Sequence, residues 1–246
     1  MPVFYTDPEN IAEDTLVITG EEMHHVHNVM RFGKGDKIMV VDGVGNGYNV
    51  QIEKLSPRKI SCGIISRVRR YGEPNSHVTL AVALSTGFKL DDIIQRATEL
   101  GVCRIIPMTA EKSIVRIDDV RREKRKLMRW RKIALASMKQ TGRSFLPEMA
   151  PITAFEDVVY KGEKTGRMIV FDPGKGHRHL EDFKVASDEK YYTLFFGPEA
   201  GFSSAEIEVA KEAGCEIYDL GARVFRSENA PAVALAVVMF LLGELR

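Results

Sequence analysis

Two glycine-containing segments near the carboxyl end of the chain carry residue types that suit a ligand site with acid–base chemistry. Residues 195–202 read Phe-Phe-Gly-Pro-Glu-Ala-Gly-Phe, and residues 220–230 read Leu-Gly-Ala-Arg-Val-Phe-Arg-Ser-Glu-Asn-Ala. Glycines let the backbone approach a flat ligand without an intervening Cβ. Arg226 and Glu228 add one charge of each sign beside that backbone. From the spacing alone, a ligand site and two ordinary strand-to-helix turns are about equally supported.

Each of these segments follows a run of residues typical of a buried strand. The apolar run 191–196 stops at Gly-Pro, and the run 216–220 ends at another glycine. Open α/β sheets bind ligands outside the carboxyl ends of their strands. We therefore expect the two loops to lie at the same edge of one sheet.

The same alternation of strands and helices extends over residues 77–246 and predicts the fold class. We expect further strands at 77–84, 104–108 and 167–171, and helices at 89–101, 120–141, 203–213 and 231–245. Alternation of this kind predicts an α/β fold with a mostly parallel sheet that is covered on both faces.

The first part of the chain has a different rhythm, and a turn-rich linker at 71–76 separates it from the rest. Residues 36–42 and 48–53 read as strands around a glycine turn at 43–47, and residues 58–70 supply enough chain for another strand pair. No helix pattern follows the glycine turn, so a nucleotide-binding loop is excluded there. We predict a small β-barrel domain over 1–73 and a second domain over 74–246.

A helical segment expected at 19–31 contains His24, His25 and His27. Neighbouring residues on a helix diverge by about 100°, and no Cys or acidic cluster at suitable spacing completes a zinc site. We expect structural or RNA-facing histidines and no metal.

Composition and cysteine usage place the chain among cytoplasmic proteins. The chain has 246 residues, of which 44% are hydrophobic and 28% charged, and its three cysteines form no CxxC pair. These features, with no secretory pattern at the amino end, fit a reducing cytosol. The longest uncharged run, 229–243, falls short of the roughly 20 apolar residues that span a bilayer. A nicotinamide-dependent enzyme is disfavoured because no GxGxxG follows a strand.

A strongly basic segment points to a polyanionic partner. The net charge of the whole chain is only +1, but residues 121–132 hold eight Lys or Arg and one acid, Glu123. A cluster of this kind on a helix favours RNA or DNA contact over the alternative of a solvated face.

The last helix is apolar almost all round, from Ala232 to Leu242. A helix without a polar face must be buried on every side. At the end of a chain this is easiest between the sheet and a second subunit, so we expect a homodimer.

Five elements in this order resemble the bacterial ribosomal small subunit (16S) rRNA uridine N3-methyltransferases of the SPOUT (α/β-knot) superfamily. Residues 24–31 resemble HHxxxVLR, and residues 89–107 with Lys112 and Ser113 resemble the KATELGV segment. Residues 130–147 resemble the family's basic helix and the turn that follows it. Residues 197–202 and 220–230 resemble GPEGGF and LGxRILRxETA. The chain departs from these motifs at Ala200, Phe225, Ser227 and Asn229.

The resemblance implies a PUA-like RNA-binding barrel, a SPOUT domain with a trefoil knot, and a homodimer that binds S-adenosylmethionine. The implied reaction is methylation of N3 of a uridine in 16S rRNA of the small ribosomal subunit. A ribose 2′-O-methyltransferase of the same superfamily and a non-catalytic RNA-binding assembly factor are the alternatives.

The resemblance also assigns roles to individual residues. Arg226 and Glu228 are the expected catalytic pair. Arg226 would stabilise the uracil oxygens or grip a phosphate, and Glu228 would orient Arg226, with direct approach to N3 as the alternative. A plain surface ion pair between the two is the structural alternative. The expected cofactor-binding residues are Gly197, Pro198, Glu199, Gly201, Leu220, Gly221, Val224, Phe225 and Arg226. The expected RNA contacts are Arg31, Lys89, Arg96, Arg125, Arg129 and Arg143.

Overall fold

A computed structural model describes residues 2–117, 119–161, 166–174, 177–185 and 189–245. The chain forms two compact units. The first comprises Met1–Glu73 with Leu135–Leu146, and the second comprises Pro74–Ala134 with Pro147–Arg246. The long helix α3 (Val120–Thr141) begins in the second unit, and its last residues belong to the first. The two domains predicted at 1–73 and 74–246 stay a prediction.

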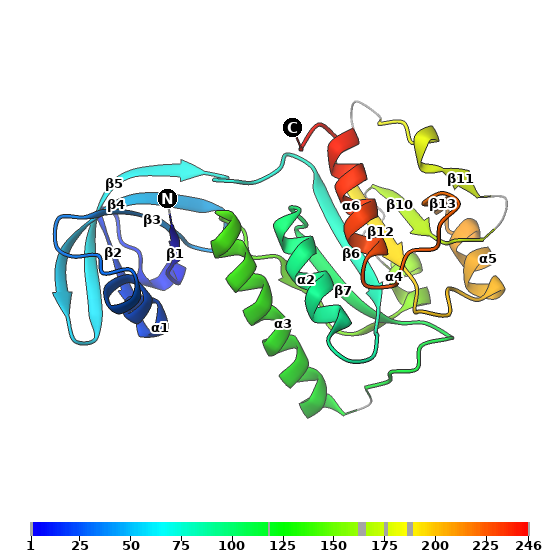
Figure 1. The fold of residues 1–246 in the computed structure, drawn as a ribbon, viewed down its shortest axis with the longest axis horizontal. Helices are drawn as coiled ribbons and strands as arrows, with labels where there is room; N and C mark the ends of the chain where they lie inside the picture. The colour runs from blue at the N-terminus through cyan, green and yellow to red at the C-terminus, as the bar shows by residue number, and fades with distance from the viewer. Residues whose placement is uncertain (1, 118, 162–165, 175–176, 186–188, 246) are drawn as a thin grey trace. The chain divides into compact units, whose positions relative to one another are not determined.

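The first unit is built on a five-stranded sheet with the order β1-β3-β4-β5-β2 (Figure 1). Its strands are β1 (Val3–Tyr5), β2 (Thr15–Thr19), β3 (Lys37–Val41), β4 (Asn46–Ser56) and β5 (Lys59–Arg69). Strand β1 runs parallel to β3, and the other pairs are antiparallel. Alternate residues such as Leu16, Ile18 and Ile60 point inward and form one core.

The glycine turn of this unit is a hairpin turn, as the sequence predicts. The Asp42 carboxylate accepts hydrogen bonds from the backbone N–H groups of Val44 at 2.9 Å and Asn46 at 3.0 Å. The Tyr48 hydroxyl donates to the same carboxylate at 3.1 Å. These bonds fix the turn between β3 and β4 because they satisfy backbone donors that the strands leave unpaired.

Two other predictions for this unit need correction. Residues 58–70 form the single long strand β5 in place of a strand pair, and β5 bonds to both β4 and β2. The helix expected at 19–31 is shorter: α1 (Gly20–His24) continues as one π-helical turn, η2 (His25–Val29). The His25 ring packs edge-on against Phe4, with centroids 5.7 Å apart, which is a structural role.

The second unit is built on an eight-stranded sheet in which all pairings of the described residues are parallel. The order is β11-β13-β10-β12-β6-β7-β8, with β9 also paired to β7. The strands are β6 (His77–Ala83), β7 (Arg104–Thr109), β8 (Glu148–Met149), β9 (Thr153–Ala154), β10 (Arg167–Phe171), β11 (Arg178–His179), β12 (Tyr191–Phe196) and β13 (Glu216–Asp219). The predicted α/β class with a mostly parallel sheet is confirmed.

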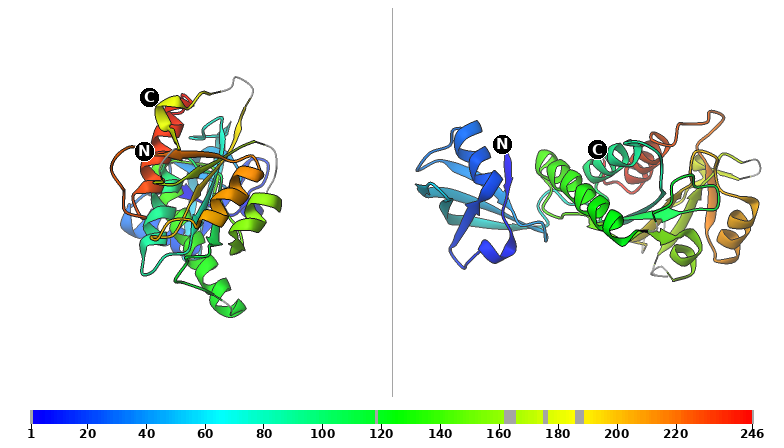
Figure 2. Two further views of the ribbon diagram at one scale, coloured as in Figure 1. Left: turned by 90° about the vertical axis from the view of Figure 1, so that its right-hand side faces the viewer. Right: turned by 90° about the horizontal axis from the view of Figure 1, so that it is seen from below.

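Helices cover both faces of this sheet (Figure 2). Helices α2 (Lys89–Glu99) and α6 (Ala230–Leu241) lie on one face, and α4 (Phe155–Lys161) and α5 (Ser204–Glu212) lie on the other. The core under α4 and α5 takes Val170 and Phe195 from the strands. Because side chains alternate along a strand, the next residues, Phe171 and Phe196, point to the face of α2 and α6.

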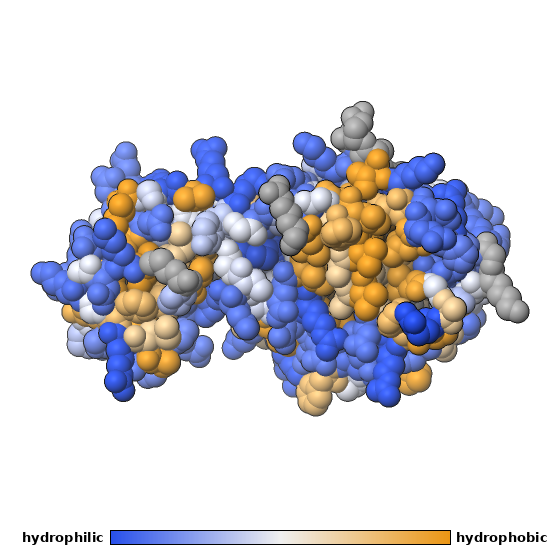
Figure 3. Space-filling model, turned by 45° about the horizontal axis from the view of Figure 1, so that its top comes forward, coloured by the Kyte–Doolittle hydropathy of each residue, from blue (hydrophilic) through white to orange (hydrophobic). Residues whose placement is uncertain are grey.

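Within one chain, α6 is buried on one side only. Leu235 and Val238 are fully buried, whereas Val237, Phe240 and Leu241 are 37%, 64% and 38% exposed. Apolar side chains gather on the surface over this helix (Figure 3). The expectation that the helix is buried on every side is therefore not met by the single chain. No helix in the described part of the chain combines the length and apolarity needed to cross a bilayer.

Candidate functional site

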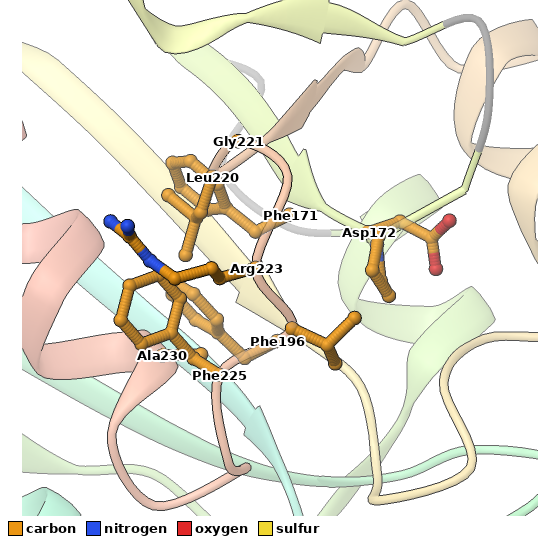
Figure 4. Close-up of a pocket in the computed structure, with 10 residues that line it drawn as sticks. Phe171, Asp172, Phe196, Leu220, Gly221, Arg223, Phe225 and Ala230 are labelled. Atoms are coloured by element: carbon orange, nitrogen blue, oxygen red, sulfur yellow. The ribbon is translucent and has the colours of Figure 1, made fainter.

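A pocket opens at the carboxyl ends of β10, β12 and β13, three neighbouring strands of the sheet (Figure 4). The space between its walls, part of which is open solvent, is about 370 Å³. It is lined by Phe171, Asp172, Pro173, Phe196, Leu220, Gly221, Arg223, Val224, Phe225 and Ala230. This is the edge at which parallel α/β sheets bind ligands.

Aromatic rings give the pocket a flat, apolar wall. The rings of Phe171 and Phe196 stack with their centroids 5.0 Å apart and their planes 10° from parallel. Leu220 and Phe225 lie beside them in the close-up (Figure 4). A Cβ built on Gly221, where φ is +93°, meets no atom within 4 Å, so the glycine leaves open space at the rim. The arrangement fits a planar heteroaromatic ligand.

Asp172 and Asp219 shape the turns that border the pocket. Asp172 accepts a hydrogen bond from Gly174 N–H at 2.9 Å, and its carboxylate lies 3.0 Å from His177 Nε2. In Figure 4 this carboxylate points away from the aromatic rings. Asp219 accepts the Gly221 N–H at 2.8 Å, and that bond lowers the pKa of the Asp219 carboxyl. Both carboxylates therefore support the backbone of the site.

The loop after β12 is held by basic side chains of its own unit. Lys89 Nζ lies 3.0 Å from Glu199 Oε1, and Lys112 Nζ donates to the carbonyl of Phe202 at 2.9 Å. Ser203 then begins α5 with a capping box in which Glu206 takes part. The capping box satisfies the backbone N–H groups of Ser203 and Glu206, and Lys112 satisfies the carbonyl of Phe202, so the end of the loop is tied to its own unit.

The predicted cofactor-binding residues therefore divide into two groups. Leu220, Gly221, Val224 and Phe225 line the pocket, whereas Gly197, Pro198, Glu199, Gly201 and Arg226 do not. Sequence reasoning missed the third segment, 171–173, and also Arg223. The signal for 171–173 was present, because the strand at 167–171 ends in Asp-Pro-Gly, the punctuation that marked the other two loops.

Arg226 and Glu228 lie on the loop between β13 and α6. The guanidinium of Arg226 is exposed, and within the described part of the chain it has no recorded hydrogen-bond or ion-pair partner. Glu228 lies 3.8 Å from Lys89 Nζ and accepts a hydrogen bond from the Ser227 hydroxyl at 3.3 Å. A hydrogen bond from its own backbone N–H, aided by Lys89, lowers the pKa of Glu228. The carboxylate is therefore ionised at neutral pH and is a weak proton acceptor.

The expected RNA contacts have different surroundings. Arg31, Arg125 and Arg129 are exposed. Arg129 also pairs with Asp91 and lies over the Phe88 ring, 4.9 Å from its centroid.

Two further members of that set, both on α2, are engaged within the second unit. Lys89 contacts Glu199 and Glu228, and Arg96 Nη1 lies 3.0 Å from Asn229 Oδ1. Arg96 Nη1 also lies 3.3 Å from the carbonyl oxygen of Glu228.

Arg143 has a structural role in place of the expected RNA contact. Its side chain is 3% exposed and pairs with the Glu73 carboxylate, itself 2% exposed, at 2.8 Å. The other oxygen of Glu73 accepts the backbone N–H groups of Ser144 and Phe145, each at 2.8 Å. Arg143 therefore holds the segment 143–145 in the first unit.

Two families of known domains match this chain, one in each part of the sequence. Residues 72–239 match the RNA methyltransferase domain family, and residues 18–65 match the RNA methyltransferase PUA domain family. Ribosomal RNA small subunit methyltransferase E of Bacillus subtilis is 33% identical over 94% of this chain and 92% of its own length. The Synechocystis protein of the same name is 31% identical over 96% of this chain and 76% of its length.

Solved structures show the same fold. Ribosomal RNA small subunit methyltransferase E from Neisseria gonorrhoeae, bound to S-adenosyl methionine, has a TM-score of 0.84 and 27% identity, covering 98% of both chains. A Legionella pneumophila methyltransferase in complex with the bound cofactor SAM has the same score and identity, over 97% of this chain and 96% of its own. The predicted fold class, a SPOUT-type domain with an N-terminal PUA-like domain, is confirmed. The chain belongs to the ribosomal RNA small subunit methyltransferase E family.

Proposed function

We propose that this chain transfers the methyl group of S-adenosylmethionine to N3 of one uridine in 16S rRNA of the small ribosomal subunit. The observation that carries the proposal is the aromatic pocket at the ends of β10, β12 and β13 in a chain of this family. The motif resemblance implies the uracil N3 target. A ribosomal RNA substrate places the reaction in the cytoplasm.

The residues present fit the cofactor. The stacked rings of Phe171 and Phe196 offer a surface for the adenine, with Leu220 and Phe225 as further apolar wall. Gly221 leaves the room that a side chain would fill. When bound, S-adenosylmethionine supplies a methyl group activated by its positive sulfonium. The trefoil knot implied by the resemblance belongs to this proposal.

Arg226 is proposed to act on the nucleobase. Methyl transfer to N3 requires loss of the N3 proton, and negative charge then grows on the two uracil oxygens. An exposed guanidinium that forms no hydrogen bond or ion pair within the described part of the chain can stabilise that charge with paired N–H donors. Glu228 is a poor acceptor for the N3 proton because its pKa is lowered, so the proton passes to solvent water. The Glu228 carboxylate instead contacts Lys89.

The RNA must present an unpaired or flipped uridine, because N3 lies on the pairing edge of the base. The exposed cations of α3, Arg125 among them, are proposed to contact phosphates near that nucleotide. Arg31 in the first unit is proposed to contact the same RNA, since it too is exposed.

We also propose that the chain works as a homodimer through α6. Phe240 is 64% exposed and stands between Val237 and Leu241 on one face of the helix. An apolar patch over a helix marks an interaction surface in a water-soluble protein. A second copy of α6 would cover it with a matching apolar face.

One experiment separates this proposal from its alternatives. The protein is incubated with labelled S-adenosylmethionine and small subunits from cells that lack the modification, and the RNA is digested to nucleosides for mass spectrometry. The expected product is N3-methyluridine. A ribose-methylated nucleoside would identify the 2′-O-methyltransferase instead. Failure of the protein to bind S-adenosylmethionine would support the non-catalytic assembly factor.

A further inference from the structure

Helix α2 begins with a positively charged residue, at the end of the helix where negative charge is favoured. Lys89 is its first residue, and the amino end of a helix carries a partial positive charge that favours acidic side chains. Asp91 and Asp92 in the same turn follow that preference. The lysine therefore needs a compensating contact, and the structure provides two.

Lys89 connects the two loops that follow β12 and β13. Its Nζ atom lies 3.0 Å from Oε1 of Glu199 on the first loop and 3.8 Å from Oε2 of Glu228 on the second. The lysine side chain is 35% exposed, and those of Glu199 and Glu228 are 33% and 21% exposed. The hydrogen bond to Glu199 raises the pKa of Lys89, so the ammonium stays charged.

Arg96 repeats this connection two turns further along α2. Residues 89 and 96 are seven positions apart and so lie on one face of the helix. Arg96 Nη1 lies 3.0 Å from Asn229 Oδ1 and 3.3 Å from the carbonyl oxygen of Glu228. Asn229 is one of the positions at which this chain departs from the motif of its family.

The other side of α2 is fixed to the second unit. Leu90, Ile93 and Ile94 are buried beneath the helix. The indole Nε1 of Trp130 donates to Asp91 Oδ1 at 3.1 Å, which joins α2 to α3. Side chains that reach from α2 to the loops therefore start from a rigid support.

We propose that Lys89 and Arg96 are positioning residues that hold the loops after β12 and β13 in register beside the pocket, in place of the RNA contacts expected from the sequence. The inference rests on the proposed cofactor site. A cation that already bonds to carboxylate and carbonyl oxygens would lose those bonds on contacting a phosphate. If the loops are already ordered in the free protein, binding of the cofactor does not have to include the free-energy cost of ordering them.

The test is the variant Lys89→Met, which keeps the length of the side chain and removes its charge. We expect its affinity for S-adenosylmethionine, measured by calorimetry, to fall about fivefold. The KM for the cofactor should rise while kcat at saturating cofactor changes by less than about twofold, the signature of lost ground-state binding. Lys89→Arg should restore most of the affinity.

The matched control is Arg125→Met on the exposed face of α3. RNA affinity is measured without cofactor, with a transcript of 16S rRNA as the probe. Arg125→Met should weaken that affinity and leave cofactor binding unchanged, and Lys89→Met should do the reverse. A cycle of Lys89→Met with Glu199→Gln should be non-additive, because the two residues contact each other.

Two results would overturn the inference: wild-type cofactor affinity in Lys89→Met, or a loss of transcript affinity in Lys89→Met equal to that of Arg125→Met. If the wild-type protein does not bind S-adenosylmethionine at all, the proposed function itself fails. Wild-type binding is measured first, so the two failures are distinguishable.

Discussion

Replacing Glu73 by alanine should loosen the attachment of the segment 143–146 in the first unit. The Glu73 carboxylate forms an ion pair with the guanidinium of Arg143 at 2.8 Å. It also accepts hydrogen bonds from two backbone N–H groups at 2.8 Å each. Both side chains of the pair are at most 3% exposed. Removing one partner of a buried pair leaves the other charge uncompensated, which costs about 3–5 kcal/mol.

Hydrogen exchange read by mass spectrometry measures this loss where it occurs. The segment bonds to the glycine turn through Gly45 N–H to Ser144 O at 3.0 Å and Leu146 N–H to Gly43 O at 2.9 Å. In Glu73→Ala, the opening free energy of peptides that cover these amides should fall by about 3–5 kcal/mol. Peptides from β6 and β12, in the second unit, should change by less than about 0.5 kcal/mol.

An exposed pair at the same distance provides the control. Lys211 and Glu208 are also 2.8 Å apart, but their side chains are 49% and 65% exposed. Lys211→Met should cost less than about 1 kcal/mol, because solvent screens exposed pairs. A loss below about 1 kcal/mol in Glu73→Ala as well would refute the reasoning that burial sets the magnitude. Glu73→Gln, which keeps an acceptor for the backbone donors, should fall between the wild type and Glu73→Ala.

Four further outcomes are expected. Arg226→Ala should abolish methyl transfer while S-adenosylmethionine still binds in calorimetry, and unchanged turnover would exclude its assigned role. Gly221→Val should prevent cofactor binding, because a branched side chain at φ +93° is strained and enters the pocket rim; wild-type affinity would contradict this. Phe240→Glu should convert the dimer to a monomer, as measured by light scattering. A monomeric wild-type protein would contradict the dimer proposal. The hydrogen bond to Asp219 raises the pKa of His179, so this contact stabilises the protein below pH ~6.5 and is lost as pH rises through the raised pKa. His179→Ala should therefore unfold at a lower temperature than the wild type at acidic pH, and this difference should disappear as pH rises. A difference that does not change with pH would argue against the contact.

Elements with strong local signals were predictable from the sequence. The expected bounds of β10 (167–171), β12 (191–196) and α3 (120–141) are those of the structure. The two strands are short, mostly apolar runs that stop at Asp-Pro-Gly and Gly-Pro, and the helix is a long segment free of glycine and proline that stops before Gly142. Helix α4 was missed although Phe155, Val158 and Val159 are buried at helical spacing, because seven residues give a weak periodic signal.

The pocket was predictable in part for a physical reason. Parallel strands bring their carboxyl ends to one edge, so loops after β12 and β13 had to be near each other. The order of the strands along that edge is not encoded in local periodicity. Strand β10 lies between β13 and β12. Because of this central place in the sheet, the residues that follow β10 line the pocket between the other two loops.

The partners of charged side chains could not be predicted from the sequence. Lys89 pairs with a residue 110 positions away, and Arg143 with one 70 positions away. A sequence shows where a cation stands, whereas its role depends on the carboxylate that the fold brings to it.

This distinction decides which cations can drive RNA binding. A cation gains affinity for RNA by releasing counterions from the phosphates that it neutralises. Lys89 is already neutralised by Glu199 and Glu228, and Arg143 is buried against Glu73, so neither offers a free charge. Arg125 is exposed on α3 and has no recorded partner in the described part of the chain. We therefore expect the basic helix to supply the electrostatic attraction for RNA, and the cations of α2 to act on the loops after β12 and β13 as proposed above.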